Sequence, residues 1–557
     1  MPYDLLILDA QIIDGTGAPA FAGDIAVHEG KIAEIGKPRG SARRVIDAKG
    51  ATVTPGFIDA HTHMDVQILW DPLATSSCWH GITTILMGNC SFGVAPCRPA
   101  DHKTVLQILE RVEGMSLAAL TAGVDWSWES FPEYLSRIEG KLGLNVATLV
   151  GHSAVRQYVM GNAASERAAS PAEISAMRET LCQALAAGAY GMSFNFNPGH
   201  VGADGRPIPS RLATFDEVLA MASTMRGKSG GLIQVAFNPK PGEDPLSAYD
   251  EISRAGECPV WWMLVQLDSQ PGVWKQRLAD SIRLIAGGSR IRGMTTSRTI
   301  DVVFTMKNAH IFDTMPAWVS VLTKSPIEIA AALQRSEVRS ALQRDFDDPL
   351  LRPLFCRRWD RIEVVKTSLD RLKHLERRKI SAIAAEQGLC GLDAFLDLCL
   401  EDNLDTEFLT VLANGDEEAV AEILLNPDTL IGLSDAGAHA ALECGYGFST
   451  HLLGHWVREK KTLSLHEAVR KLTSMIADQM GLTDRGRIRP GLAADLNILD
   501  PSTVNMLQPV PVNDFPGGAK RFIQKSIGIS HTIVNGQILM ENGEHVGSYP
   551  GQLLRRS

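Results

Sequence analysis

The chain has 557 residues, a formal net charge of -10 and a pI near 5.9; 45% of its residues are hydrophobic and 21% are charged. This balance is typical of a globular enzyme with room for a large barrel and accessory units, and it argues against disorder. Because no basic field dominates, it also argues against nucleic acid or an anionic membrane as a partner.

The N-terminus reads as a β-strand and lacks the cationic and apolar regions of a secretory signal. No run approaches the ~20 apolar residues that cross a bilayer. Nine cysteines without paired spacing predict free thiols in a reducing compartment. The sequence therefore predicts a cytoplasmic protein.

Short β-prone runs separated by turn glycines fill residues 1–54, and similar sequence returns at 486–557, where Asn535-Gly536 predicts a hairpin. Between these ends, apolar runs alternate with helical patterns, as a parallel barrel requires. The eight strand candidates are residues 57–60, 83–87, 146–150, 191–194, 232–236, 260–265, 292–296 and 429–434. The predicted fold is an α/β protein with a (β/α)8 barrel.

Helices are expected at 104–114, at 171–187 with Ser170 as N-cap, and at 214–226. The interval from about 323 to 425 is charged and is expected to be helix-rich, with helices over 361–387 and 391–400. Because it is longer than one crossover needs, it predicts an inserted helical lobe, which either shapes substrate access or serves as scaffolding.

His61 and His63 close the first barrel strand, and i, i+2 spacing on a strand sends both imidazoles to one face, where they can bind a metal. In such barrels the site lies at the carboxyl ends of the strands, so residues that follow the other runs are candidates as well. Cys90 follows the second run, and a thiolate is a good zinc ligand. Asp435 follows the last run, where a helix N-cap is the competing interpretation.

The motif Pro55-Gly56-Phe57-Ile58-Asp59-Ala60-His61-Thr62-His63 resembles the first metal-binding strand of the amidohydrolase superfamily. Residues 81–90, 151–156 and 188–193 narrow the resemblance to its N-acyl-D-amino-acid deacylase, or D-aminoacylase-like, branch. This resemblance covers nearly the whole chain. It implies a TIM-like barrel in residues 55–485 and a composite β-sandwich domain built from 1–54 and 486–557. It also implies that Cys90 is a zinc ligand and that Asp435 is metal partner and general base.

The resemblance departs at two positions, because the deacylases carry two further metal-binding histidines after the fifth and sixth strands. Residues 231–238 and 259–266 contain none. His61, His63 and Asp435, with Cys90, are therefore expected to hold one Zn²⁺, or another divalent ion, rather than two.

Four further side chains are expected to contact substrate or to orient a ligand, namely His152, Gln234, Gln266 and His439. A satisfied core histidine is an equal alternative for His152, and a structural role is the alternative for His439. Arg156 and Arg298 are candidates for binding a substrate carboxylate, although position alone does not select them.

The sequence thus predicts a metal-dependent amidohydrolase that cleaves an amide C–N bond of a small N-acylated substrate, like an N-acyl-D-amino acid, with metal-activated water. Two alternatives stay open: hydrolysis of a cyclic amide, lactone or imine on the same barrel, and a barrel that has lost catalysis and serves as a scaffold. The exact substrate, its stereochemistry and homo-oligomerisation are left open by the sequence.

Overall fold

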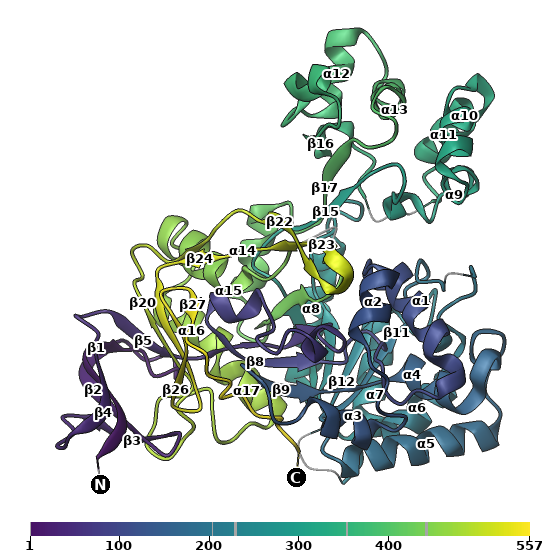
Figure 1. Cartoon of the computed structure of the whole chain (residues 1–557). Coiled ribbons are helices and arrows are strands. Elements are labelled where there is room, and N and C mark those ends of the chain that lie inside the picture. The colour runs from purple at the N-terminus through teal and green to yellow at the C-terminus, as the bar shows by residue number, and fades with distance from the viewer. Residues whose placement is uncertain (1, 203, 228–230, 352–354, 441–443, 557) are drawn as a thin grey trace. The chain divides into compact units, whose positions relative to one another are not determined.

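The computed structural model describes residues 2–202, 204–227, 231–351, 355–440 and 444–556. The chain divides into two compact units (Figure 1). Unit 1 contains Met1–Leu264, Arg277–Arg298 and Glu422–Ser557, and unit 2 contains Val265–Gln276 and Thr299–Ala421. Among the described residues, no helix has the length and apolar character needed to cross a membrane.

Eight parallel strands of unit 1 close into a barrel, which confirms the predicted (β/α)8 fold. Three of the eight are interrupted by a single residue. In order they are β6 (Phe57–Asp59) with β7 (His61–Thr62), β8 (Ile82–Met87), β9 (Asn145–Thr148) with β10 (Val150–Gly151), β11 (Gly191–Asn195), β12 (Leu232–Ala236), β13 (Val260–Met263), β14 (Ile291–Thr295), and β18 (Leu430–Ile431) with β19 (Leu433–Ala436). Each pairs in parallel with the next, and β19 pairs with β7 to complete the ring.

Apolar side chains of the barrel strands form a packed core. Because these strands are buried on both faces, they read in sequence as nearly continuous apolar runs, which is why their positions could be predicted. The core includes Ile58, Ala60, Leu86, Leu149, Leu232, Trp261, Met294 and Leu430.

Helices cover the barrel, and the predicted N-cap at Ser170 is present. Ser170 starts α5 (Pro171–Ala186) with a reciprocal capping box to Glu173, and Thr214 caps α6 (Phe215–Ser223). Further helices of unit 1 are α1 (His102–Glu113), α2 (Leu117–Gly123), α3 (Phe131–Ile138), α4 (His152–Met160), α7 (Pro245–Gly256), α15 (Phe448–His451), the π-helical η9 (Leu452–Glu459), α16 (Leu465–Leu472) and α17 (Ser474–Met480). Two helices, α8 (Val273–Ala286) and α14 (Glu417–Leu425), contain residues of both units.

Strands from both chain ends form one nine-stranded sheet. Its path runs β27 (Glu544–His545), β26 (Gln537–Glu541), β25 (Ile529–Val534), β20 (Leu496–Leu499), β5 (Thr52–Pro55), β1 (Tyr3–Ile12), β2 (Phe21–His28) and β3 (Lys31–Gly36), with β4 (Ala42–Asp47) paired to β1. The antiparallel β5–β20 pair joins the two ends, which appear in purple and yellow in Figure 1. Asn535 and Gly536 take positive φ in the β25–β26 hairpin, as the sequence predicted. Two smaller pairs are β21 (Asn505–Met506) with β24 (Ser526–Ile527) and β22 (Val510–Phe515) with β23 (Ala519–Ile523).

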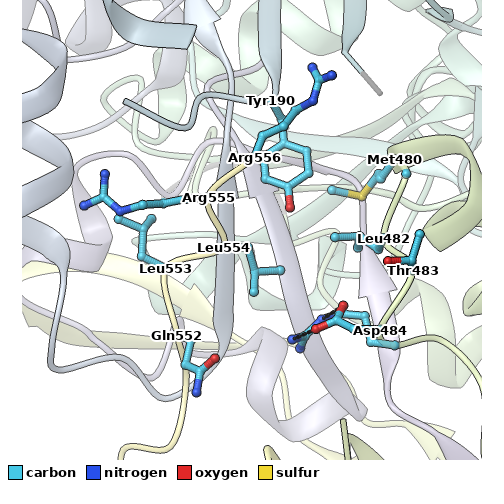
Figure 2. A pocket seen from close by; sticks show the side chains of 12 residues that line it. Tyr190, Met480, Leu482, Thr483, Asp484, Gln552, Leu553, Leu554, Arg555 and Arg556 are labelled. Carbon is cyan, nitrogen blue, oxygen red and sulfur yellow. Dashed lines mark hydrogen bonds and ion pairs between the residues drawn. The ribbon is translucent and has the colours of Figure 1, made fainter. Parts of the chain in front are cut away.

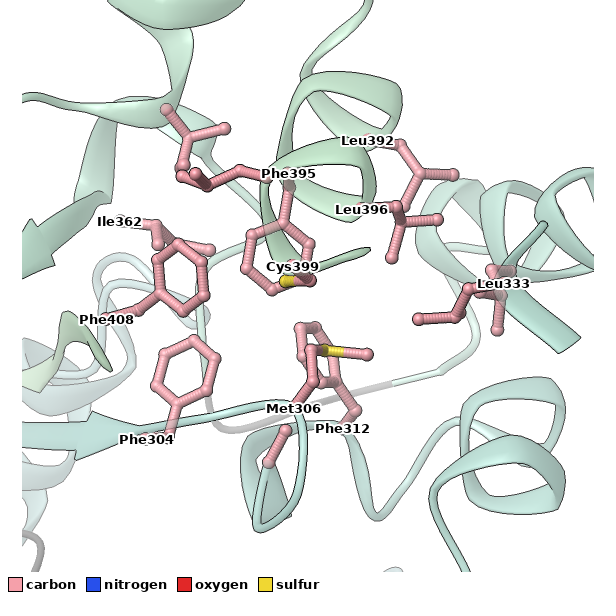
Figure 3. Packing of buried hydrophobic residues seen from close by; sticks show 14 of the residues in the cluster. Phe304, Met306, Phe312, Leu333, Ile362, Leu392, Phe395, Leu396, Cys399 and Phe408 are labelled. Carbon is pink, nitrogen blue, oxygen red and sulfur yellow. The ribbon is translucent and has the colours of Figure 1, made fainter. Parts of the chain in front are cut away.

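Unit 2 has its own aromatic core around an antiparallel sheet of β15 (Ile300–Phe304), β17 (Glu407–Ala413) and β16 (Ile362–Lys366). The side chains of Phe304, Phe395 and Phe408 gather there (Figure 3), with 4.7 Å between the ring centroids of Phe395 and Phe408. Its helices are α9 (Pro316–Leu322), α10 (Pro326–Leu333), α11 (Ser336–Asp347), α12 (Ile380–Gln387) and α13 (Gly391–Glu401).

One expected helix in this unit is wrong. Residues 362–366 form strand β16, a short 3-10 helix follows at Asp370–Leu375, and only the end of the predicted 361–387 helix is α-helical, as α12. Ile362 and Val364 are buried at a spacing of two, the period of a strand, and this segment pairs with β17. The tertiary partner therefore overrides the helical composition.

Candidate functional site

His61 and His63 lie where the first barrel strand ends, and Asp435 lies on the neighbouring strand. The β7–β19 pairing, together with the His63 N–H that donates to the Ala436 carbonyl, brings these segments side by side. One carboxylate oxygen of Asp435, Oδ1, is 3.0 Å from His63 Nε2 and 3.4 Å from His61 Nε2. Both imidazoles of the first motif thus lie beside a single carboxylate oxygen, which belongs to a residue far along the chain.

Backbone geometry holds this arrangement. Asp435 has φ 59°, a left-handed conformation that is uncommon for a residue other than glycine and that concentrates at functional sites. Gly437 follows with φ 93°, and a Cβ there would come within 2.5 Å of the His63 carbonyl oxygen. Only glycine lets this loop pass so close to His63.

Cys90 completes the cluster from the second barrel strand. Its Sγ is 3.4 Å from His61 Nε2, and ligand atoms of Cys90, His61 and His63 all lie within 4.8 Å of one another. The Cys90 N–H donates to Gln234 Oε1 at 2.8 Å, so the amide of Gln234 fixes the loop that carries the thiol. Cys90 also has positive φ, 52°.

The four side chains shift one another's proton affinities. Burial lowers the pKa of His61, but Cys90 and Asp435 outweigh it and raise it to about 9. Burial raises the pKa of the Cys90 thiol, yet His61 and His63 bring it below its usual range. Burial likewise opposes ionisation of Asp435, but hydrogen bonds from both imidazoles hold its pKa well below the ordinary value. Within the cluster, the imidazoles thus favour ionisation of the thiol and the carboxylate, and these two groups favour protonation of the imidazoles.

Further buried carboxylates surround the cluster. Glu113, at the end of α1, has Oε1 3.5 Å from His63 Nδ1, the nitrogen opposite the one that faces Asp435. Asp65 accepts a hydrogen bond from the Gly88 N–H, and burial raises its pKa to about 6. This excess of acidic groups around buried histidines favours a cation.

The donor set fits a divalent metal. Two imidazoles, one thiolate and one carboxylate oxygen are ligands that zinc prefers. Because a metal binds the neutral imidazole and the ionised thiol, metal binding at this site would be coupled to proton release. A carboxylate beside His63 Nδ1 is the usual partner that orients a histidine ligand.

The other sequence candidates lie in different surroundings. Gln234 adjoins the cluster through its bond to Cys90. His439 has φ 49° and donates its backbone N–H to the Glu113 carbonyl at 2.5 Å, which ties the loop after Asp435 to the end of α1. Gln266 belongs to unit 2, where its Nε2 donates to Asp268 Oδ1 and its Oε1 accepts from the Asp416 N–H.

His152 lies in a buried polar network at the start of α4. Its Nδ1 is 3.0 Å from Ser210 Oγ and its Nε2 is 3.1 Å from Glu217 Oε1. Glu217 also pairs with the fully buried Arg156. These partners match the alternative of a satisfied core histidine for His152. The guanidinium of Arg156 belongs to the same network through its ion pair with Glu217.

Sequence reasoning missed two residues near the cluster, Glu113 and His200. Glu113 ends a surface helix and gives no local signal. His200 follows the fourth barrel strand, so the rule that selected Cys90 and Asp435 could have selected it. The charges of His63, Asp435 and His439 all act on its imidazole.

A cavity of about 580 Å³ lies elsewhere in unit 1. Figure 2 shows the hydroxyl of Tyr190 pointing toward it, between residues 480–485 and the C-terminal residues 552–556. Tyr190 immediately precedes β11 and so lies at the amino end of that strand, whereas the cluster lies at the carboxyl ends. The cavity is therefore separate from the candidate site.

Comparison with known proteins places these features in context. The amidohydrolase family model matches residues 44–540. The chain is 29% identical to N-acyl-D-aspartate deacylase of Alcaligenes xylosoxydans xylosoxydans, over 99% of this chain and 95% of that one. It is 26% identical to D-aminoacylase of the same organism, over 100% and 98%. A crystal structure of D-aminoacylase superposes with a TM-score of 0.69 at 25% identity over the whole of both chains. These matches confirm the resemblance predicted from the motifs.

Proposed function

Because this chain belongs to the amidohydrolase family, we propose that it is a metal-dependent hydrolase that cleaves the amide C–N bond of a small N-acylated amino acid. The observation that carries the proposal is the convergence of His61, His63, Cys90 and Asp435 at the carboxyl ends of three barrel strands. The deacylase names of its relatives support the substrate class, with N-acyl-D-amino acids first.

We propose that His61, His63 and Asp435, with Cys90, hold one zinc or similar divalent ion. When bound, the ion supplies Lewis acidity, which polarises the scissile carbonyl and makes a nearby water molecule more acidic. Among the described residues, one group of three or more histidine, cysteine and acidic side chains has metal-binding spacing. In a D-aminoacylase with a binuclear centre, one metal activates and the second attenuates, so a single ion is compatible with this chemistry.

Asp435 is the general base in this proposal. Its side chain is 29% exposed, so water reaches its carboxylate. It takes a proton from the attacking water and returns that proton to the leaving nitrogen. Glu113 holds His63 in the orientation that this step needs.

We place this activity in the cytoplasm and propose a small-molecule substrate as the partner. All nine cysteines are free thiols, which supports a reducing compartment.

The test combines metal content with a substrate panel. Protein purified without added metal or chelator is analysed for metal per chain, and is then assayed with N-acetyl-D-amino acids, their L-enantiomers and cyclic amides. We expect about one ion per chain, hydrolysis of an N-acyl-D-amino acid, and loss of activity on chelation that zinc restores. Hydrolysis of cyclic amides alone would replace the proposed substrate class. A metal-free, folded and inactive protein would support the scaffold alternative.

A further inference from the structure

His200 lies in the segment that follows β11, between two phenylalanine rings. Its ring centroid is 5.9 Å from that of Phe92 and 6.5 Å from that of Phe237. Phe92 follows β8 and Phe237 follows β12, so the three rings gather at the carboxyl end of the barrel, where the metal-binding cluster lies. Phe237 is 39% exposed and has φ 63°, a costly conformation for a bulky residue that concentrates at functional sites.

Hydrogen bonds determine which nitrogen of His200 carries its proton. The Asn197 N–H donates to Asn195 Oδ1 at 2.9 Å, so this amide oxygen is the acceptor and the orientation of the Asn195 amide is settled. The Asn195 Nδ2–H therefore donates to His200 Nδ1 at 3.0 Å. Because Nδ1 accepts, the proton of a neutral His200 ring must be on Nε2.

His200 is neutral at physiological pH. Burial and, to a smaller extent, the charges of His439, His63 and Arg211 together lower its pKa to about 3, although Asp435 opposes them. The same charges show that the ring lies in the electrostatic field of the cluster. Nε2 makes no hydrogen bond with any residue that the structure describes.

The backbone of His200 is held from three sides. Its N–H donates to the Asn197 carbonyl at 3.1 Å, and its own carbonyl accepts from Arg211 Nη1 at 2.9 Å and from the Ile208 N–H at 3.4 Å. Such a segment presents the Nε2–H donor in a fixed position, so little reorganisation is needed when it binds an acceptor.

We propose that the Nε2–H of His200 is a catalytic hydrogen-bond donor that binds the carbonyl oxygen of the scissile amide. This inference rests on the proposed hydrolase function. The donor stabilises the negative charge that develops on that oxygen as the carbonyl carbon becomes tetrahedral. The imidazole stays neutral and transfers no proton, so the proton taken and returned by Asp435 remains the only one that moves. Phe92 and Phe237 flank the ring and limit its movement.

Two variants of similar size separate the donor from the ring. His200→Gln keeps an N–H donor at the end of the side chain, whereas His200→Met has none. We expect kcat of His200→Met to fall by about 10²–10³-fold relative to the wild type, with a smaller change in KM. The kcat of His200→Gln should be at least roughly ten times that of His200→Met. Metal content and the thermal midpoint should match the wild type in both variants. Equal kcat in the wild type and both variants overturns the proposal. An equal loss of kcat in His200→Gln and His200→Met overturns it as well.

A spectroscopic readout separates this inference from the proposed function. The ¹⁵N resonances of His200 in the metal-loaded protein, assigned by their loss in His200→Gln, should show a neutral ring protonated at Nε2. Protonation at Nδ1 overturns the proposal whether or not the enzyme is active. If the wild type hydrolyses no acylated amino acid, the proposed function fails, and an Nε2-protonated ring then still supports a neutral donor for another carbonyl substrate.

Discussion

At the scale of single residues, Asp435 connects the metal-binding cluster to catalysis, because one of its oxygens contacts both imidazoles. Asp435→Asn keeps the shape of the side chain but removes the proton acceptor. We expect kcat to fall by about 10²–10⁴-fold with KM little changed, as measured by steady-state kinetics. Asp370→Asn is the control, because Asp370 is an exposed carboxylate. Wild-type kcat in Asp435→Asn would exclude the general-base role.

His61 should decide whether the ion is retained. It contacts both Cys90 Sγ and Asp435 Oδ1, so His61→Ala removes the ligand that links the thiolate to the carboxylate. We expect elemental analysis to find about one ion per wild-type chain and less than about a tenth of that in the variant. The exposed His374 provides the control, His374→Ala, which should keep the metal. Full occupancy in His61→Ala would mean that His61 is not a ligand.

Gly437 tests the backbone that positions His63. Gly437→Ala adds a Cβ 2.5 Å from the His63 carbonyl oxygen at φ 93°. The matched control is Gly543→Ala, where φ is 79° and no atom lies within 4 Å, so only the conformational cost of about 1–2 kcal/mol applies. We expect Gly437→Ala to lower the free energy of unfolding by more than the control and to weaken metal binding, as followed by thermal denaturation and metal titration. Equal effects of the two would show that the close contact with His63 is unimportant.

At the scale of elements, α16 is anchored through a buried lysine. Lys471 Nζ donates to the carbonyls of Asn426 and Thr429, which precede strand β18. Burial lowers its pKa to about 8 from 10.5. Between these pH values the unfolded chain holds a proton that the folded chain has released, so the free energy of unfolding rises with pH across this window. Over this window the lowered pKa changes the free energy of unfolding by on the order of 3 kcal/mol. This stabilisation is complete above pH 10.5 and is lost progressively as the pH falls to about 8.

Lys471→Met should remove this slope. Unfolding free energies measured by denaturant titration from pH 7.5 to 10.5 should rise more steeply in the wild type than in the variant. The tyrosines, the thiols and the other lysines titrate in both proteins, so the difference between the two slopes isolates Lys471. Parallel curves would show that its pKa is not lowered by burial.

At the scale of the whole molecule, unit 2 has a hydrophobic core that shares no residue with the metal-binding cluster. Phe395 is fully buried there beside Phe408. Phe395→Ala should destabilise unit 2 by about 3–5 kcal/mol, because it leaves a cavity. Calorimetry should show an earlier transition for this unit while metal content stays at the wild-type level. Leu389→Ala, at an exposed position, is the control. Loss of metal in Phe395→Ala would show that the two units are coupled.

The sequence alone was enough to place the eight barrel strands, the two β-rich ends and the cap of α5. These features depend on local patterns: apolar runs buried on both faces, an Asn-Gly turn, and a serine three residues before a glutamate. Local pattern failed at β16, where a charged, helix-like composition gave way to pairing with β17.

The residues of the candidate site likewise divide into those that the sequence predicted and those that only the structure revealed. The sequence by itself determined that His61 and His63 share a face, because two-residue spacing on a strand leaves no other choice. The resemblance of the motifs predicted that Cys90 and Asp435 join them, and the structure brings the four side chains together. Only the tertiary structure decided that Glu113 lies behind His63, that His152 pairs with Glu217, and that Asn195 orients His200. The physical reason is distance along the chain: barrel closure pairs β7 with β19, over 370 residues apart, and no local propensity encodes which buried groups then become neighbours.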